Sequence, residues 1–312
     1  MSTDSNPRVL AIGEVLWDII DGTEHIGGAP FNLAAHLSRL GCQASILTRI
    51  GMDRRGQAAT EQMKKLGVDT DFVQRDSEHP TGWARVELTG DGVPTYHFPG
   101  DPAYDFIEVD DSLLHHLAET RFDAICFGTL QQKGERTHQS LMRVLESVRA
   151  PHVLYDVNIR LDFYPQEILR QSLAFSTVLK LNTDEAPMIA ERLYGVVLPE
   201  AELVSQLAAD FPVRVVCITK GAEGCAVYGD GTSHHFACEP VKVADTVGAG
   251  DAFSAAFLQH YCQTGDFLTS AQRGNLLGAY VASRPGAVPE YEDSIRERLS
   301  MSHAARTIPA DL

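Results

Sequence analysis

Asp245-Thr246-Val247-Gly248-Ala249-Gly250-Asp251 lies between an extended segment and a helical pattern that begins at Ala252. The small residues 248–250 let the backbone turn sharply and approach a ligand closely. Their N–H groups and the first free amides of the helix point at one spot, which also carries the positive end of the helix dipole. The stretch therefore predicts an anion-binding turn where a strand gives way to a helix.

The acidic residue at the end of this turn has two interpretations. An acid at a helix start is often an N-terminal cap, which would explain Asp251 without any chemistry. A phosphate-binding turn needs no carboxylate, however, and a carboxylate beside incoming phosphates is unfavourable unless it has a task. During phosphoryl transfer a weak base within reach of the acceptor hydroxyl can take its proton. Asp251 is therefore the candidate base, and the amides of Gly248, Ala249 and Gly250 are the candidate anion hole.

The rest of the chain excludes the two best-known alternatives for phosphate chemistry. It contains no G-x-x-x-x-G-K-[ST] sequence, so it is not a P-loop enzyme. It also lacks the Gly-rich loop and catalytic motif of protein kinases.

Apolar, β-branched-rich runs alternate with segments of helical period along the chain. Strands are expected at residues 9–20, 43–50, 84–89, 124–128, 152–158, 178–182, 214–220 and 225–228. Helices are expected at residues 30–40, 55–66, 135–150, 185–193, 200–209, 252–261 and 271–283. Such alternation predicts an α/β fold, with a mostly parallel central sheet covered by helices on both faces.

Two stretches break the alternation. Residues 14–28 continue past the first strand without a helix, and residues 81–100 contain two extended runs joined by Gly90-Asp91-Gly92, which is hairpin chemistry. Together they predict a small β-layer, a lid, that projects from the main sheet. No repeat or long linker is present, so residues 1–312 are expected to form a single domain.

Composition limits the partners. The formal net charge is −16, with 26 Lys and Arg against 42 Asp and Glu, which argues against a nucleic-acid partner. ATP is still possible, because a nucleotide needs only a local nest of amides and a metal ion. No apolar run reaches the length of a membrane span and the first residues are polar, so we expect a cytoplasmic protein with no membrane partner.

Several motifs occur together in one order. They are Gly27-Gly28-x-x-x-Asn32, Asp156-x-Asn158-x-Arg160, Asn182-x-x-Glu185, Thr219-x-Gly221 and the D-T-V-G-A-G-D-A-F run that starts at Asp245. This set resembles the PfkB, or ribokinase-like, carbohydrate kinases, and most closely the bacterial fructokinase branch. The resemblance implies a ribokinase-like fold, with a small β-sheet lid on a mostly parallel sheet, and ATP-dependent phosphorylation of a sugar.

The resemblance also implies roles for particular residues on the nucleotide side. Asp251 would be the base, and Arg160 would contact the sugar or the transferring phosphoryl group. Mg²⁺ would be held partly through water by Asn182 and Glu185. The residues expected to line the ATP site are Asn182, Thr219, Gly221, Gly250 and Asn275. A monovalent cation, K⁺, would bind Asp245 and the Val247 carbonyl, with backbone near residues 283–286.

On the sugar side the resemblance implies six contacts. These would come from Asp18, Gly27, Gly28, Asn32, Asp156 and Asn158. Taken alone, each has a plainer interpretation, as a turn acid, a helix start or a polar loop. Carboxylates and amides are nevertheless the groups that bind paired sugar hydroxyls.

The acceptor stays open at the level of sequence. The resemblance favours fructose, giving fructose 6-phosphate, although residues 98–105 depart from the usual fructokinase pattern of an Ala-Asp pair shortly after an Arg. Other hexoses, 2-keto-3-deoxygluconate, ribose and a nucleoside are alternatives, as is a regulator that binds sugar or nucleotide without turnover. Pairing of two lids into a homodimer is also expected from the family.

Overall fold

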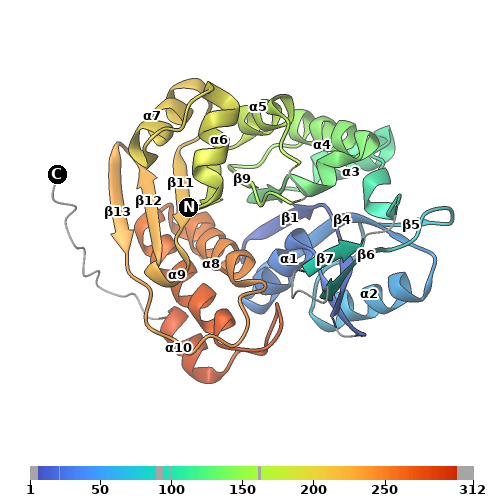
Figure 1. Cartoon of the computed structure of the whole chain (residues 1–312). Coiled ribbons are helices and arrows are strands. Elements are labelled where there is room, and N and C mark those ends of the chain that lie inside the picture. Colours follow the sequence, from blue (N-terminus) through green and yellow to red (C-terminus); the bar gives the residue numbers. More distant parts are fainter. Residues whose placement is uncertain (1–5, 21, 89–93, 98–99, 161–162, 301–312) are drawn as a thin grey trace.

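Among the residues that the structure describes, the main sheet has nine strands in the order β13-β12-β11-β10-β9-β8-β1-β4-β5. We describe residues 6–20, 22–88, 94–97, 100–160 and 163–300 of a computed structural model (Figure 1). Neighbouring strands run parallel along the part of the sheet formed by β5, β4, β1, β8, β9, β10 and β11. Strands β12 and β13 add an antiparallel edge beside β11. Their bounds are β1 (Arg8–Ile12), β4 (Gln43–Gly51), β5 (Val73–Asp76), β8 (Ala124–Phe127), β9 (His152–Asp156), β10 (Val178–Asn182), β11 (Val215–Thr219), β12 (Cys225–Gly229) and β13 (Thr232–Phe236).

Helices cover both faces of this sheet, as the sequence predicts (Figure 1). One face carries α1 (Ala29–Arg39), α2 (Arg54–Lys65), α8 (Ala249–Thr264) and α9 (Phe267–Ala282), and α10 (Asp293–Ser300) packs on α9. The other face carries α3 (Asp111–Glu119), α4 (Glu135–Ser147), α5 (Gln166–Phe175), α6 (Glu185–Tyr194) and α7 (Glu200–Asp210). Side chains alternate along each strand, so Val9 and Ala11 of β1 enter one core and Leu10 and Ile12 enter the other.

Local sequence explains where several elements begin. Strand β8 reads Ala-Ile-Cys-Phe and is buried throughout, which is typical of the middle of a parallel sheet. Pro30 lies in the first turn of α1, where its missing N–H costs nothing. Asp53 caps α2 by accepting a hydrogen bond from the Gly56 amide at 2.8 Å.

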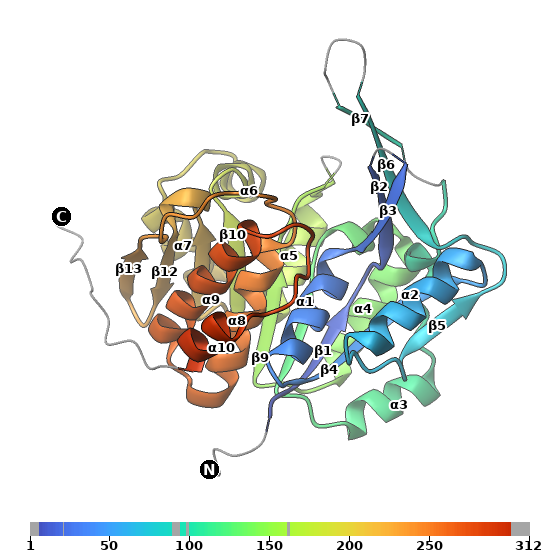
Figure 2. The ribbon, with the colours of Figure 1, turned by 90° about the horizontal axis from the view of Figure 1, so that it is seen from below.

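The lid is a second sheet that projects from the edge of the main body (Figure 2). Its strand order is β3-β2-β6-β7, and the bounds are β2 (Leu16–Ile20), β3 (Thr23–Gly27), β6 (Gly82–Leu88) and β7 (Pro94–His97). Strands β2 and β6 run parallel, and the outer pairs are antiparallel. Trp83 and Arg85 lie on one side of β6, with the Arg85 guanidinium 5.4 Å from the Trp83 ring centre.

Several boundaries differ from the sequence-based prediction. The expected strand at residues 9–20 is two strands, because the chain leaves the main sheet at residues 13–15 and enters the lid. Helix α8 begins at Ala249 rather than Ala252, so the glycine turn forms its first turn. Strands β5 and β13 and helices α3, α5 and α10 were missed, because these segments are short or largely polar. The predicted hairpin at Gly90-Asp91-Gly92 lies outside the described residues.

The winding of the sheet reverses at β1. From β1 the chain proceeds to β4 and β5 on one side, and later to β8, β9, β10 and β11 on the other. In open α/β sheets, ligands bind outside the carboxyl ends of the strands at such a reversal. The carboxyl ends of β1 and β8 are therefore the place to look for a site. Within the described parts of the chain, no helix is long and apolar enough to cross a membrane.

Candidate active site

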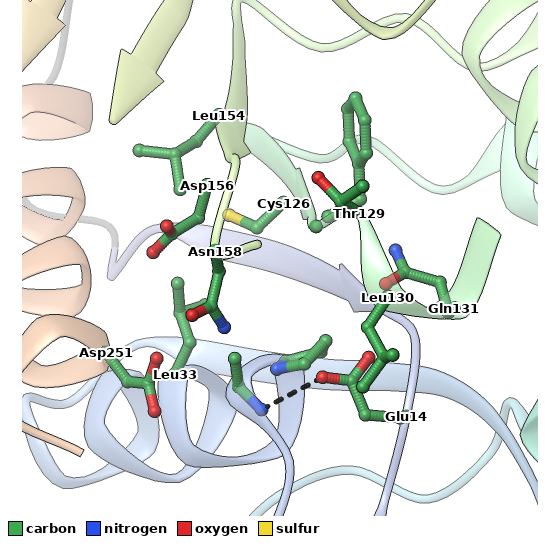
Figure 3. A pocket seen from close by; sticks show the side chains of 14 residues that line it. Glu14, Leu33, Cys126, Thr129, Leu130, Gln131, Leu154, Asp156, Asn158 and Asp251 are labelled. Carbon is green, nitrogen blue, oxygen red and sulfur yellow. Dashed lines mark hydrogen bonds between the residues drawn. The ribbon is translucent and has the colours of Figure 1, made fainter. Parts of the chain in front are cut away.

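A cavity lies at the carboxyl ends of β1, β8 and β9, where the winding of the sheet reverses. Its walls also include the starts of α1 and α8 and the short helix η2 (Leu130–Lys133). Figure 3 shows Asp251 on one wall, Glu14 on the opposite wall and Asn158 between them. Of the residues predicted from sequence, the fold thus brings Asp156, Asn158 and Asp251 to one cavity although they are distant in the chain.

The glycine turn forms the N-terminus of α8. Gly248 is the N-cap, in a left-handed conformation with φ of 78°. Among the described residues, the amides of Gly248, Gly250 and Asp251 donate no hydrogen bond, whereas the Ala249 amide donates to the Thr246 carbonyl at 3.3 Å. The predicted anion hole is therefore offered by the amides of Gly248 and Gly250, joined by that of Asp251, more than by Ala249.

Asp251 is held in place by Asn32 of α1, whose Nδ2 donates to Oδ2 at 2.8 Å. Burial raises the pKa of the Asp251 carboxyl to about 6, and the charge of Asp156 adds to the rise. The hydrogen bond from Asn32 and the charges of Lys180 and Arg160 oppose it. A carboxylate with a pKa just below neutrality is ionised at pH 7 and is a better proton acceptor than an ordinary aspartate.

A buried ion pair supports this wall. Lys180 Nζ lies 3.0 Å from Asp156 Oδ1, and both side chains are less than 10% exposed. The other Asp156 oxygen accepts from Ser254 Oγ of α8 at 3.1 Å, so Asp156 faces the cavity only with the lone pairs that these partners leave free. Burial alone would lower the pKa of Lys180, but Asp156, Glu185 and Asp251 raise it above its usual value. Lys180 is therefore charged, and its Nζ lies 3.0 Å from where a Cβ at Gly250 would be.

The Gly27-Gly28 pair connects the lid to the site. A Cβ at Gly27 would lie 2.6 Å from Asp18 Oδ2, so the missing side chain gives the Asp18 carboxylate its place. Gly28 has φ of 108°, and a Cβ there would lie 2.5 Å from the Glu14 carbonyl. Burial raises the pKa of Asp18, against the charge of Arg160 and then that of His25.

Asn158 and Arg160 follow β9. Asn158 adopts φ of 40°, a conformation that is uncommon outside glycine and is often found at functional sites. Arg160 is exposed and its Nη1 donates to the Ile159 carbonyl at 3.0 Å. Its charge lowers the pKa values of Asp18 and Asp251, so Arg160 faces the acidic side of the site.

Asn182 and Glu185 form a reciprocal cap at the start of α6. Asn182 Oδ1 accepts from the amides of Asp184 and Glu185, both at 2.9 Å, and Glu185 Oε2 accepts from the Asn182 amide at 2.9 Å. Glu185 Oε1 accepts from the Ile159 amide at 2.8 Å. Mg²⁺ usually keeps several waters and binds one or two carboxylates plus substrate phosphates, so the oxygens of these residues fit contacts through water. The described residues contain no cluster of three metal-binding side chains.

The predicted nucleotide-binding residues Thr219, Gly221 and Asn275 lie at the end of β11, in the turn after it and on α9. Thr219 ends β11 and Gly221 starts the turn after it, with φ of 56°. Asn275 of α9 donates to the carbonyls of Phe236 and Ala237, at 3.3 and 2.9 Å, and so fixes the end of β13.

Asp245 links the loop before α8 to the segment after α9. It accepts hydrogen bonds from the amides of Val247 at 3.0 Å and Gly286 at 3.2 Å. The structure thus brings Asp245 and Val247 beside the backbone near residues 283–286, as the predicted cation site requires.

Sequence reasoning missed several side chains that the structure places at the site, among them Glu14, Gln131 and Lys180. Glu14 and Gln131 line the cavity, and Lys180 lies behind the glycine turn. Lys180 carried a usable signal, because a single charge inside the apolar strand β10 implies a buried partner. Glu14 directly follows Gly13 at the end of β1, which marks the carboxyl edge only once the sheet order is known.

An anion-binding helix start beside a buried carboxylate, at the reversal point of an α/β sheet with a lid, defines a small-molecule kinase that works without a P-loop. The comparison with known families agrees, since residues 6–293 match the pfkB family carbohydrate kinase. The chain belongs to this family, and it is an ATP-dependent carbohydrate kinase with a ribokinase-like fold.

Individual relatives span nearly the whole chain. A fructokinase of Escherichia coli is 30% identical over 271 residues, which cover 83% of this chain and 85% of that protein. The structure of an uncharacterized sugar kinase from Pyrococcus horikoshii has a TM-score of 0.76 at 26% identity, covering 94% of this chain and 100% of that one. Two further structures agree in fold at lower identity. A double mutant of Vibrio cholerae fructokinase in fructose, ADP and potassium ion bound form has a TM-score of 0.81 at 22% identity, covering 95% and 99%. Aminoimidazole riboside kinase from Salmonella enterica has a TM-score of 0.80 at 20% identity, covering 94% and 100%.

The raised pKa of Asp251 predicts a pH profile. If its carboxylate is the base, kcat/KM rises with pH through about 6 and then levels off, because only the ionised form accepts a proton. Replacing Asn32 by leucine removes a hydrogen bond that lowers this pKa, so the midpoint moves to higher pH. Initial rates between pH 5 and 8 measure both effects. A flat profile, or a midpoint that Asn32→Leu leaves in place, contradicts the assignment.

The Lys180–Asp156 pair predicts a stability effect. Lys180→Met leaves the Asp156 carboxylate buried without its cation and should cost about 3–5 kcal/mol of the free energy of unfolding. Adding Asp156→Asn removes the orphaned charge and should restore a large part of that loss. Urea unfolding at pH 7 measures the three variants against the parent protein. A Lys180→Met protein as stable as the parent shows that the pair is not buried as described.

Proposed function

We propose that this kinase transfers the γ-phosphoryl group of ATP to a hydroxyl of fructose, giving fructose 6-phosphate and ADP. The observation that carries the proposal is the position of Asp251, on the wall of the acceptor cavity and in the same helical turn as the free amides of Gly248 and Gly250. Similarity to fructokinases supports fructose as the acceptor.

In the proposed reaction Asp251 takes the proton of the attacking hydroxyl as its oxygen bonds to the γ-phosphorus and the bond to the ADP oxygen breaks. The transferring group is most stabilised by donors aimed at its oxygens. The amides of Gly248 and Gly250 would supply these donors. The Ala249 amide can join them only when its hydrogen bond to the Thr246 carbonyl breaks. Lys180 adds a fixed positive charge behind Gly250, and Arg160 adds a second positive charge that acts on Asp251.

The sugar contacts follow the same geometry. We assign hydroxyl binding to Asp18 and the backbone of Gly27 and Gly28 on the lid side, and to Asn32 and Asn158 on the sheet side. Asp156 would contribute with the lone pairs that Lys180 and Ser254 leave free. These are the group types that recognise paired sugar hydroxyls.

For the nucleotide, we propose that ATP lies along the turn after β11, beside Thr219 and Gly221, with Asn275 holding the neighbouring β13 end. Mg²⁺, when bound, neutralises phosphate charge, and Asn182 and Glu185 would hold its waters. Asp245 and the Val247 carbonyl would hold K⁺ next to the glycine turn. The Vibrio cholerae fructokinase structure, which shares this fold, is in a potassium ion bound form and supports K⁺ as the ion.

Other acceptors are compared in one assay. ADP release is measured with ATP, Mg²⁺ and a panel of fructose, other hexoses, ribose, 2-keto-3-deoxygluconate, adenosine and aminoimidazole riboside. The riboside belongs in the panel because a kinase for it shares this fold. Fructose should give the highest kcat/KM. A higher value for another acceptor reassigns the substrate, and no turnover of any acceptor leaves a regulator that binds without catalysis.

Removing the base should abolish most of the rate. Asp251→Asn should lower kcat by roughly 10²–10⁴-fold while ATP still binds, because amide nitrogen cannot accept the hydroxyl proton. Asp71→Asn, on an exposed turn before β5, is the matched control and should match the parent protein. Near-parental turnover of Asp251→Asn removes Asp251 from the mechanism.

The lid sheet is the basis for predicting a homodimer. We propose that two chains pair through their lid sheets, since β3 and β7 are the edge strands of the lid among the described residues and an edge strand can pair with another chain. Light scattering at working concentration should give the mass of a dimer. A monomer of 34.1 kDa contradicts this proposal and leaves the kinase assignment untouched.

A further inference from the structure

Two acceptor oxygens in the wall of the cavity have no donor. Glu14 Oε2 and Gln131 Oε1 are buried and lack a hydrogen-bond partner among the described residues. Both residues line the cavity that Asp251 also lines, on the side away from Asp251 (Figure 3). A buried acceptor without a donor is unfavourable, so two at one place point to a ligand that supplies the donors.

Neighbouring contacts fix the direction of both side chains. Glu14 Oε1 accepts from the Ala29 amide at 3.2 Å, at the start of α1, which leaves Oε2 for the cavity. Gln131 Nε2 donates to the Ile12 carbonyl at 3.3 Å, so the amide nitrogen is on the sheet side and Oε1 is the free end. Capping of α1 explains one oxygen of Glu14, but it explains neither the second oxygen nor Gln131.

The shape of the cavity limits what can reach them. Leu33, Cys126 and Leu154 form apolar parts of its lining, and Thr129 and Asn158 are polar neighbours. The enclosed part of the cavity has a volume of ≈ 20 Å³, which is room for about one water-sized group. A hydroxyl or hydroxymethyl arm fits such a space, whereas a nucleobase ring does not.

Charge limits the ligand further. Burial raises the pKa of Glu14 to about 7, and Asp251 adds to the rise while Arg160 opposes it. Among the described residues, the positive charges that lower the pKa values of Glu14, Asp18 and Asp251 come from Arg160, Lys180 and, at Asp18, His25, and Lys180 is already paired with Asp156. A carboxylate on the ligand would meet like charge here, whereas a neutral hydroxyl can donate to an ionised Glu14 or accept from a protonated one.

We infer that Glu14 and Gln131 form a subsite that accepts hydrogen bonds from one hydroxyl arm of a neutral sugar, and that this subsite selects against sugar acids. The inference rests on the proposed sugar-kinase function and adds the chemistry of its acceptor: a neutral polyol with a free hydroxyl at the end remote from the transferred phosphoryl group.

The first experiment pairs variants of the full chain with monodeoxy analogues of fructose, each lacking one hydroxyl. For one analogue, kcat/KM of the parent protein should fall roughly 10- to 100-fold, because two buried acceptors lose their donor. Gln131→Met keeps the side-chain size and removes the acceptor, so the same analogue should lose less than about threefold against fructose. Gln139→Met, on the exposed face of α4, is the control and should keep the parental pattern.

The inference is overturned if Gln131→Met leaves the penalty for the deoxy analogue unchanged. If every deoxy analogue is penalised equally in Gln131→Met and the parent protein, these oxygens do not bind the sugar and Gln131 only packs. Because Glu14→Gln could weaken the start of α1, its thermal unfolding is compared with that of Glu61→Gln on exposed α2, and Gln131→Met carries the test if Glu14→Gln unfolds.

The second experiment measures binding without turnover, by calorimetry with fructose and with 2-keto-3-deoxygluconate. Fructose should bind at least tenfold more tightly to the parent protein, and Glu14→Gln should narrow that ratio. Equal or tighter binding of the sugar acid overturns the inference. If no acceptor is phosphorylated, the proposed function fails, but this binding ratio still decides whether the subsite selects a neutral polyol.

Discussion

The contact between Asp156 and Lys180 holds the site together. One Asp156 oxygen binds Lys180 on the neighbouring strand, and the other accepts from Ser254 on α8. A single carboxylate therefore ties β9, β10 and the helix that carries the glycine turn. Because a buried charge without its partner is strongly destabilising, the three elements keep one relative position. Asp251 lies one turn before Ser254 on α8, so the same contact also positions the Asp251 backbone. Asn32 of α1 then fixes the Asp251 side chain.

A second contact, between uncharged groups, holds the segment that packs on Gly248 of the glycine turn. His36 of α1 is fully buried between the Tyr291 hydroxyl at 2.6 Å and the Ala287 carbonyl at 2.9 Å, and burial lowers its pKa to about 4. Ala287 in turn packs on Gly248, where a Cβ would lie 2.5 Å from the Ala287 carbonyl. The neutral histidine does not titrate near pH 7, so pH acts on the site through its carboxyls.

The sequence was most informative where local chemistry leaves a short signature. The run from Asp245 to Asp251 predicted an anion-binding helix start, and strand–helix alternation predicted the layered sheet; the fold agrees with both. Glu14 and Gln131 could not be found in this way, because their importance depends on β1 and β8 being neighbours, which is a property of the strand order. The nine-residue helix α3 and the largely exposed strand β13 were missed, because an element this short gives only a weak periodic signal in the sequence.

The brevity of the link between the two sheets has a mechanical consequence. Only residues 13–15 separate β1 from β2, and Gly28 alone separates β3 from α1. In the part of the chain that the structure describes, a hinge-like rotation of the lid changes dihedral angles at these links and at residues 77–81, which lead from β5 to β6. The first link includes Glu14, and the second ends at the Ala29 amide that binds it. A change in the tilt of the lid therefore displaces Glu14 in the cavity wall. The opening of the lid and the contacts of this wall with the acceptor are mechanically coupled.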